Sequence, residues 1–314
     1  MNDQFDAGRF RSELVKGRLR AAMSYLSQFP DQSERYARYT ALFQEEKYLT
    51  YGVDRELNGI LLCYQKYYRE TFYLEQNPEE AARRLWGRLA DCFQLSGDIS
   101  DAIETERVDA AFRARGFHFL GGRTSGYWGP YIWRDEEVKR YTVELPGGER
   151  EYAVKFLNGF VMKSWLDYIS FGEAGTGGWS DGDGLICCVR DAYDLDGESF
   201  RVSLLKHEAQ HAADLETYRG ISSEDLEYRA KLVELIYSRE RDLLERFAGE
   251  ADTSRAGNGH GIAACRLLEG VERLLNVPRE AFTSLPVEDV QAAARTLFAE
   301  STREAGKKYN TTTP

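Results

Sequence analysis

The stretch His207-Glu208-Ala209-Gln210-His211 holds two of the four histidines in the chain, four residues apart. On an α-helix this spacing places both imidazoles on one face, one turn apart, where a single zinc ion can bind a nitrogen from each. Glu208 lies about 100° further round the helix. From there it can take a proton from a zinc-bound water and pass it to a leaving amine. The stretch therefore predicts a catalytic metal site on a helix.

The flanking sequence also favours a helix at this position. No glycine or proline occurs between Glu198 and Arg219, and Asp196 and Ser199 are both suitable N-terminal caps. The competing interpretation is a chance match of five residues on a solvated helix. The scarcity of histidine in this chain weighs against that interpretation.

This H-E-x-x-H motif resembles that of the zincin metallopeptidases, and the resemblance covers the motif helix and its neighbours. The metzincin subclass would need a glycine where Asp214 stands and a histidine where Thr217 stands, so it is excluded. A peptide deformylase would carry an aspartate where Gln210 stands. A gluzincin takes its third ligand, a glutamate, from the following helix. Such a helix is predicted from Ser222 onward.

Two glutamates of that following helix are candidates for the third ligand. Glu227 begins a Glu-x-x-Ala pattern with Ala230, which resembles the third-ligand pattern of many gluzincins and lets the two helices approach closely. Glu224 lies in the first turn of the helix, where the helix dipole already explains an acidic residue. We expect zinc to be bound by His207, His211 and Glu227, with Glu224 as the alternative third ligand.

Further residues are expected to support the metal. Zincins commonly place a histidine, tyrosine or arginine opposite the catalytic glutamate to stabilise the oxyanion, and the resemblance implies this role for His260. Tyr218 and Tyr237 are alternatives, and a histidine in a surface loop is the competing interpretation of His260. Asp214, three residues after His211, is expected to accept the second ring N–H of a histidine, unless it is an ordinary solvated acid.

Composition limits the classes of partner and compartment. The net charge of −11 over 314 residues argues against nucleic acid and against anionic membrane surfaces. The five cysteines form no C-x-x-C pair, which favours reduced thiols of a cytoplasmic protein over a disulfide framework. No apolar signal segment and no membrane-spanning run is visible. We expect a cytoplasmic protein that acts on a peptide or protein substrate, with its oligomeric state open.

The first part of the chain, residues 1–115, reads as a helical region. The predicted helices cover residues 10–29, from Asp31 or Ser33 to about Thr50, from Asp54 to before Asn77, from Pro78 onward, and from Gly97 to near Gly116. Dense aromatic residues at helical spacing are expected to form its interior.

From Gly116 onward the composition changes to glycine, aromatic and β-branched residues. Strands are predicted at residues 117–120, 131–133, 140–145, 151–157 and 184–190, with a hairpin turn at Pro146-Gly147-Gly148. Zincins carry a small sheet before the motif helix, and its edge strand binds the substrate; the resemblance implies this role for residues 184–190. We expect residues 175–184 to be a flexible loop beside the cleft. The third-ligand helix should continue through residues 238–247. Later helices are predicted at residues 262–275 and 286–305, the last one capped by Ser284, before a disordered polar tail.

The sequence thus predicts an α+β protein with a helical region (residues 1–115) and a zincin-like catalytic domain (residues 116–314) whose small mixed sheet precedes the motif helix. The predicted function is that of a zinc-dependent metallopeptidase. Two alternatives remain open, a zinc hydrolase of a non-peptide amide or ester and a non-catalytic zincin-fold binding or regulatory module. Glu208 speaks against the second, because a structural zinc site favours a fourth protein ligand and has no need of that carboxylate.

Overall fold

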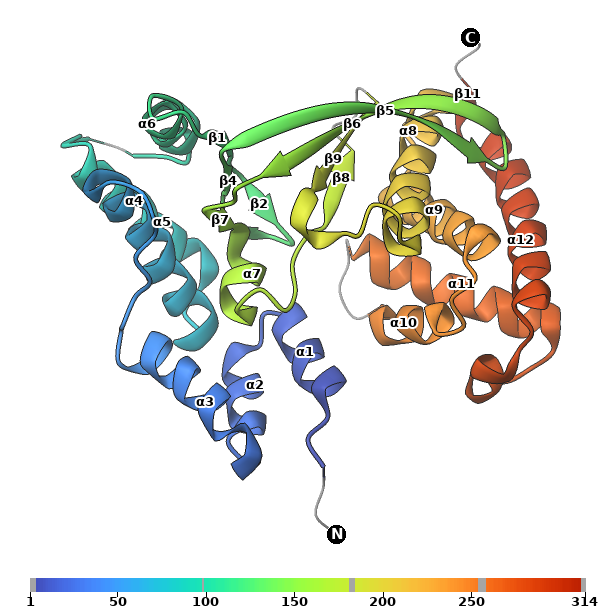
Figure 1. Cartoon of the computed structure of the whole chain (residues 1–314), viewed down its shortest axis with the longest axis horizontal. Coiled ribbons are helices and arrows are strands. Elements are labelled where there is room, and N and C mark those ends of the chain that lie inside the picture. Colours follow the sequence, from blue (N-terminus) through green and yellow to red (C-terminus); the bar gives the residue numbers. More distant parts are fainter. Residues whose placement is uncertain (1–3, 98, 181–183, 254–257, 312–314) are drawn as a thin grey trace. The chain divides into compact units, whose positions relative to one another are not determined.

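The computed structural model describes residues 4–97, 99–180, 184–253 and 258–311, and it shows an α+β protein (Figure 1). By its internal contacts the chain forms two compact units. The first contains Met1–Asp135 and Asn158–Thr176, and the second contains Glu136–Leu157 and Gly177–Pro314. All of the predicted site residues belong to the second unit.

The helices of the first unit begin where the predicted caps stand. Asp54 accepts a hydrogen bond from the backbone N–H of Leu57, and Asn77 accepts from the first turn of the helix that Pro78 opens. The helices are α1 (Ala7–Val15), α2 (Leu19–Leu26), α3 (Ser33–Tyr39), α4 (Arg55–Tyr68), α5 (Pro78–Cys92), α6 (Asp109–Arg113) and α7 (Ser164–Ser170). Wider π-helical turns extend α3 as η2 (Thr40–Gln44), extend α4 as η3 (Arg69–Tyr73) and precede α6 as η4 (Glu104–Val108).

Two helix predictions in this unit are wrong. The expected single helix over residues 10–29 is broken between α1 and α2 at Gly17, whose φ of +70 is a left-handed conformation that ends a helix. The next helix, expected to run to about Thr50, ends with η2 at Gln44.

A small antiparallel sheet completes the core of the first unit. Its strands are β1 (His118–Leu120), β4 (Tyr131–Trp133) and β7 (Met162–Lys163), in the order β1-β4-β7. A separate two-stranded sheet is formed by β2 (Arg123–Thr124) and β3 (Tyr127–Trp128). Phe119 and Ile132 of the three-stranded sheet belong to the same buried cluster as the helices. This shared core explains why the contact-defined unit continues past Gly116, where the composition changes, as far as Asp135.

The second unit is built on a four-stranded sheet with the order β5-β6-β9-β8. Its strands are β5 (Asp135–Leu145), β6 (Gly148–Asn158), β8 (Gly178–Ser180) and β9 (Leu185–Val189). The predicted hairpin is confirmed, because β5 ends directly before the turn at Pro146-Gly147 and β6 begins directly after it. β9 runs parallel to β6 and antiparallel to β8.

The prediction that residues 184–190 form the edge of the sheet is wrong. The strand predicted at residues 184–190 is β9 (Leu185–Val189), which lies between β6 and β8, so the edges of the sheet are β5 and β8. β8 comes from the glycine-rich segment that was expected to be a flexible loop; residues 181–183 of that segment lie outside the described residues. Glycine permits this pairing, because a Cβ on Gly178 would lie 2.4 Å from the carbonyl oxygen of Cys187.

The motif helix follows this sheet and starts with wide turns. The π-helical segment η6 (Ser199–Lys206) leads without a break into α8 (His207–Thr217). The expected caps are wrong, because no side chain caps the start of η6 and Asp196 instead pairs with Arg201. Phe200 of η6 and Ala209 and Ala213 of α8 pack in one core with residues of β5, β6 and β9, which places α8 against the sheet.

The remaining helices are α9 (Ser223–Tyr237), α10 (Leu243–Glu250), α11 (Gly259–Leu275) and α12 (Val287–Lys308), followed by β11 (Asn310–Thr311). Three expectations are corrected here. α9 ends at Tyr237 and α10 is a separate helix; no side chain caps α12; and Asn310–Thr311 pairs with β10 (Tyr218–Arg219) where a disordered tail was expected. Residues 312–314 lie outside the described part. In the part that the structure describes, no helix is both long and apolar enough to cross a lipid bilayer.

Candidate metal site

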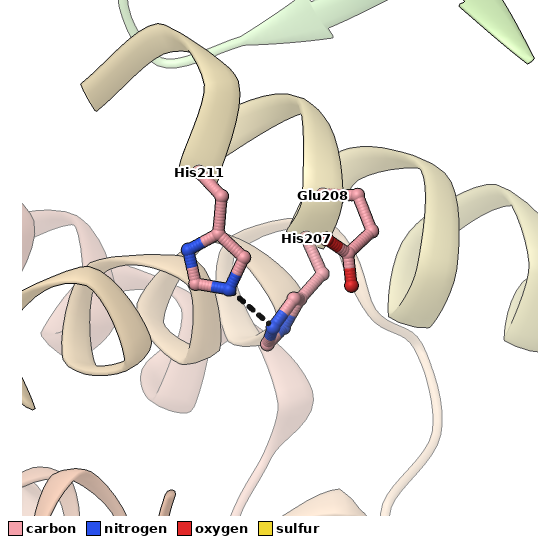
Figure 2. A group of neighbouring side chains, drawn as sticks. All are labelled: His207, Glu208 and His211. Carbon is pink, nitrogen blue, oxygen red and sulfur yellow. Dashed lines mark hydrogen bonds between the residues drawn. The ribbon is translucent and has the colours of Figure 1, made fainter. Parts of the chain in front are cut away.

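The two histidines of the motif face each other on α8. Their Nε2 atoms lie 3.0 Å apart, and Figure 2 shows both rings turned toward one another with Glu208 beside them on the same helix. A carboxylate oxygen of Glu208 and one ring nitrogen from each of His207 and His211 lie within 4.8 Å of one another. The helical spacing of the motif therefore produces the cluster that was expected from it.

Glu227 reaches the same point from α9. Its carboxylate lies 3.5 Å from Nε2 of His207 and 3.5 Å from Nε2 of His211. Ala230, one turn further along α9, is fully buried, as expected where two helices approach closely. Within the described residues Glu224 makes no such contact. Of the two third-ligand candidates, the structure brings Glu227 to the imidazoles.

The spacing of these ligand atoms fits a zinc ion. Bonds of about 2.0–2.1 Å and tetrahedral angles place neighbouring ligand atoms about 3.3–3.4 Å apart. The observed separations are 3.0, 3.5 and 3.5 Å. In addition, Oε2 of Glu227 is buried and has no well-aligned hydrogen bond among the described residues, although His260 lies close to it. A buried carboxylate whose Oε2 lies near His207 and whose Oε1 lies near His211 completes a donor set that suits zinc.

Glu234 supports the first histidine, a contact that sequence reasoning missed. Its Oε1 lies 2.7 Å from Nδ1 of His207, and both side chains are buried. The signal was present in the sequence, because Glu234 follows Glu227 by seven residues, or two helical turns, on the same face of α9. Nδ1 of His211, in contrast, is buried without a partner among the described residues.

The role predicted for Asp214 is corrected by the structure. Its Oδ2 accepts a hydrogen bond from Nε of Arg229 at 2.8 Å, and both side chains are buried. The carboxylate therefore faces a guanidinium on α9 where a histidine ring was expected. A buried arginine is a stronger competitor for a carboxylate than a neutral imidazole N–H, because it offers charge as well as hydrogen bonds.

His260 lies in the first turn of α11, where a loop was expected, and is brought to the cluster. Its Nδ1 lies 2.9 Å from Oε2 of Glu227, and its side chain is 65% exposed, against 9% for His207 and 12% for His211. His260 therefore lies on the side of the His207, His211 and Glu227 cluster that faces solvent. The structure places it on Glu227, and among the described residues it has no contact with Glu208.

The electrostatic field of the buried carboxylates at this site favours a cation. Burial by itself lowers the pKa of His207, but the carboxylates of Glu227 and Glu234 outweigh burial and raise that pKa to about 10. Burial likewise opposes ionisation of Glu227, and the imidazoles of His207, His211 and His260 overcome it and hold the pKa of Glu227 well below its usual range. A divalent metal would take the place of the imidazole proton in this field.

Tyr193 is a second residue that sequence reasoning missed. Burial raises the pKa of its hydroxyl, and the charges of Cys188, Glu208 and Glu234 add to that effect, which places the hydroxyl within electrostatic reach of Glu208. The expected alternatives lie elsewhere, because Tyr218 packs in a cluster with residues of α12 and Tyr237 lies under the ammonium of Lys206.

Comparison of the chain with protein-family models, with curated proteins and with solved structures gives no match.

Proposed function

We propose that this protein is a zinc-dependent metallopeptidase in which His207, His211 and Glu227 hold the metal. The observation that carries this proposal is the carboxylate of Glu227, which comes from a different helix and lies 3.5 Å from both imidazole nitrogens. A chance pentapeptide on a helix would have no reason to meet a third ligand at this spacing. Zinc, when bound, would polarise a substrate carbonyl and lower the pKa of a water molecule.

In this proposal Glu208 is the general base. Its carboxylate lies beside the imidazoles without being held by them, so it is free to take the proton of the attacking water and to pass it to the leaving nitrogen. The oxyanion would accept a hydrogen bond from His260, which lies on the solvent side of the group, with the hydroxyl of Tyr193 as the alternative donor. Glu234 holds the proton on Nδ1 of His207, which leaves Nε2 free for the metal.

A peptide substrate is favoured by the edge of the sheet. Among the described strands β8 pairs with β9 alone, which places it at an edge of the sheet, and it packs beside α8. An extended peptide could add to this edge as a further strand and present its backbone near the metal group. A non-peptide amide or ester would make no use of such an edge, which is why we prefer a peptidase over those alternatives.

Metal content, measured by mass spectrometry, tests the site. The wild type and Glu208→Gln should each contain about one zinc per chain, whereas His211→Ala and Glu227→Gln should lose it, because a three-ligand catalytic site cannot spare one ligand. Glu224→Gln is the matched control and should keep its zinc. A wild type without zinc after reconstitution, or equal loss in both glutamate variants, would contradict the ligand assignment.

Activity tests the chemistry. Zinc-loaded protein should cleave an unfolded protein such as reduced and alkylated casein, and Glu208→Gln should lower the rate about a hundredfold or more while zinc is retained. Cleavage that is unaffected by Glu208→Gln would exclude this residue as the base. If small esters or amides are hydrolysed and peptides are not, the non-peptide alternative would replace the peptidase.

A further inference from the structure

The second unit contains a cavity that is separate from the metal group. It has a volume of about 1040 Å³ and lies between the β5–β6 turn, α8, α9 and α12; Figure 1 shows the long hairpin reaching toward α12. None of the metal-group residues lines it. On α8 its lining forms a stripe displaced around the helix from the two imidazoles: Gln210, Ala213, Asp214 and Thr217.

The lining of this cavity is cationic, although the chain as a whole is acidic. Four arginines and two carboxylates line it, which gives a net charge of +2 in a chain whose net charge is −11. These residues are Arg150, Arg229, Arg295, Arg303, Glu144 and Asp214. Such a local field attracts an anion.

Two of the arginines are available to a ligand. Arg229 is engaged in its buried pair with Asp214, and Arg150 pairs with Glu216. Arg295 and Arg303, both exposed on α12, have no carboxylate partner among the described residues; Arg295 makes only a long contact, 3.4 Å, to the carbonyl oxygen of Ile236. A guanidinium offers a planar pair of donors that matches a carboxylate.

A polar side chain also lines the cavity. Gln210 is 4% exposed, and no residue in the described part forms a hydrogen bond with its side-chain amide. The amide itself is not fully buried, so it opens to the cavity and is available to a polar group from outside the chain. Much of the remaining lining is apolar, including Leu145, Ile236 and Phe298. A large, partly apolar cavity with a few convergent polar groups is typical of a small-molecule site.

We propose that this cavity is a second binding site, for an organic acid with an apolar body. Its carboxylate pairs with Arg295 and Arg303, its apolar body lies against Leu145 and Phe298, and a polar group on it satisfies Gln210. The site does not depend on the proposed peptidase activity, because none of its residues is a proposed metal ligand.

The test uses two fluorescent probes that differ only in charge, 4-(1-pyrenyl)butyrate and 4-(1-pyrenyl)butanol. Fluorescence anisotropy titrations of the full chain should show saturable binding, with the acid bound roughly tenfold or more tightly than the alcohol, because hydrogen bonds to charged groups are the stronger ones. The double variant Arg295→Ala/Arg303→Ala should lose this preference. Lys307→Ala removes one exposed cation from the same helix, outside the cavity lining, and should keep it.

Each titration is repeated with a chelator, because a carboxylate can also bind zinc directly. The preference for the acid should survive chelation. Any of four results would overturn the proposal. The first two are a lack of saturable binding of the probes and equal affinity for the acid and the alcohol. The other two are a preference for the acid that persists in the double arginine variant and a preference that disappears when the metal is removed. Both arginines are exposed, so their replacement leaves the core intact, and circular dichroism verifies the fold of each variant.

Discussion

The hydrogen bond between Glu234 and His207 decides which ring nitrogen is available to a metal. With a proton held on Nδ1 by the carboxylate, the lone pair of the ring lies on Nε2, the nitrogen that faces His211 and Glu227. The contact therefore orients the ring of His207, the first of the proposed ligands, although Glu234 itself touches no other member of the cluster among the described contacts.

Removing this carboxylate should weaken zinc binding. We expect Glu234→Gln to lower the affinity for zinc about 10- to 100-fold, measured by competition with a chromophoric chelator. Asp214→Asn is the control. It should lower the free energy of unfolding by about 3–5 kcal/mol, because Arg229 is left buried and unpaired, and change zinc affinity much less. The reverse pattern would mean that Asp214 is the supporting carboxylate after all.

Cys92 should be the most reactive thiol at neutral pH. Its Sγ lies 3.7 Å from that of Cys63, and the hydrogen bond from Cys63 outweighs partial burial and lowers the pKa of Cys92 to about 7. The thiolate reacts, so the rate of alkylation by iodoacetamide should rise about tenfold per pH unit below pH 7 and level off above pH 8. Mass spectrometry of each cysteine peptide measures this rate. Cys63→Ala removes the hydrogen-bond donor and should shift the profile to higher pH; an unshifted profile would contradict this cause.

At the scale of elements, glycine and wide helical turns decided where the sequence predictions failed. The starts of α4 and α5 were predictable, because Asp54, Asn77 and Pro78 act locally. The break at Gly17 was not, because the sequence alone does not show which glycine adopts a φ of +70; in the folded chain a Cβ there would also lie 3.1 Å from the Phe72 ring. The edge position of β8 depends in the same way on close contacts that only the folded chain reveals.

Two glycine substitutions should therefore have opposite effects on the first unit. Gly17→Ala should lower the free energy of unfolding by about 1–2 kcal/mol, because φ is +70 and a Cβ would lie 3.1 Å from the Phe72 ring. Gly59→Ala, within α4 and in open space, should raise it by about 0.5–1 kcal/mol. Urea denaturation measures both. Equal effects of the two substitutions would show that Gly17 is not strained.

At the scale of the whole molecule, the sequence was most informative where the chemistry is local. Three residues of one motif, His207, Glu208 and His211, were enough to predict their cluster, because helical periodicity places them on one helix; Glu227 was predicted from the next helix. Partners such as Glu234, Tyr193 and the arginine that binds Asp214 required tertiary packing. The two-unit division could not be predicted from composition alone, because β1, β4 and β7 share a core with helices far away in sequence.

A buried carboxylate should make the stability of the first unit depend on pH. Glu104 of η4 accepts hydrogen bonds from Tyr64 and from the backbone of Gly122, but burial dominates and raises its pKa to about 7. The folded chain therefore holds this proton up to a higher pH than the unfolded chain does. Stability from this group is present below about pH 4.3, the unfolded pKa, and is lost as pH rises to about 7.

Comparison with Glu104→Gln isolates this effect, because the amide does not titrate. The difference in free energy of unfolding, wild type minus variant, should fall by about 3 kcal/mol between pH 4 and pH 8, measured by urea denaturation at each pH. A difference that stays constant with pH would mean that the pKa of Glu104 is the same in the folded and the unfolded chain.

The glycines before the edge strand also determine which mutations the protein can tolerate. A Cβ on Gly177 would lie 2.1 Å from the hydroxyl of Tyr193, and one on Gly178 would lie 2.5 Å from Leu204 of η6. A segment that reads as a permissive linker is thus one of the least substitutable parts of the chain. In a library of random variants selected for folded protein, we expect these two positions to stay glycine while their neighbours vary. Such a pattern of tolerated mutations would show that the sheet edge packs closely against the segment before the motif helix, which the composition of the loop does not reveal.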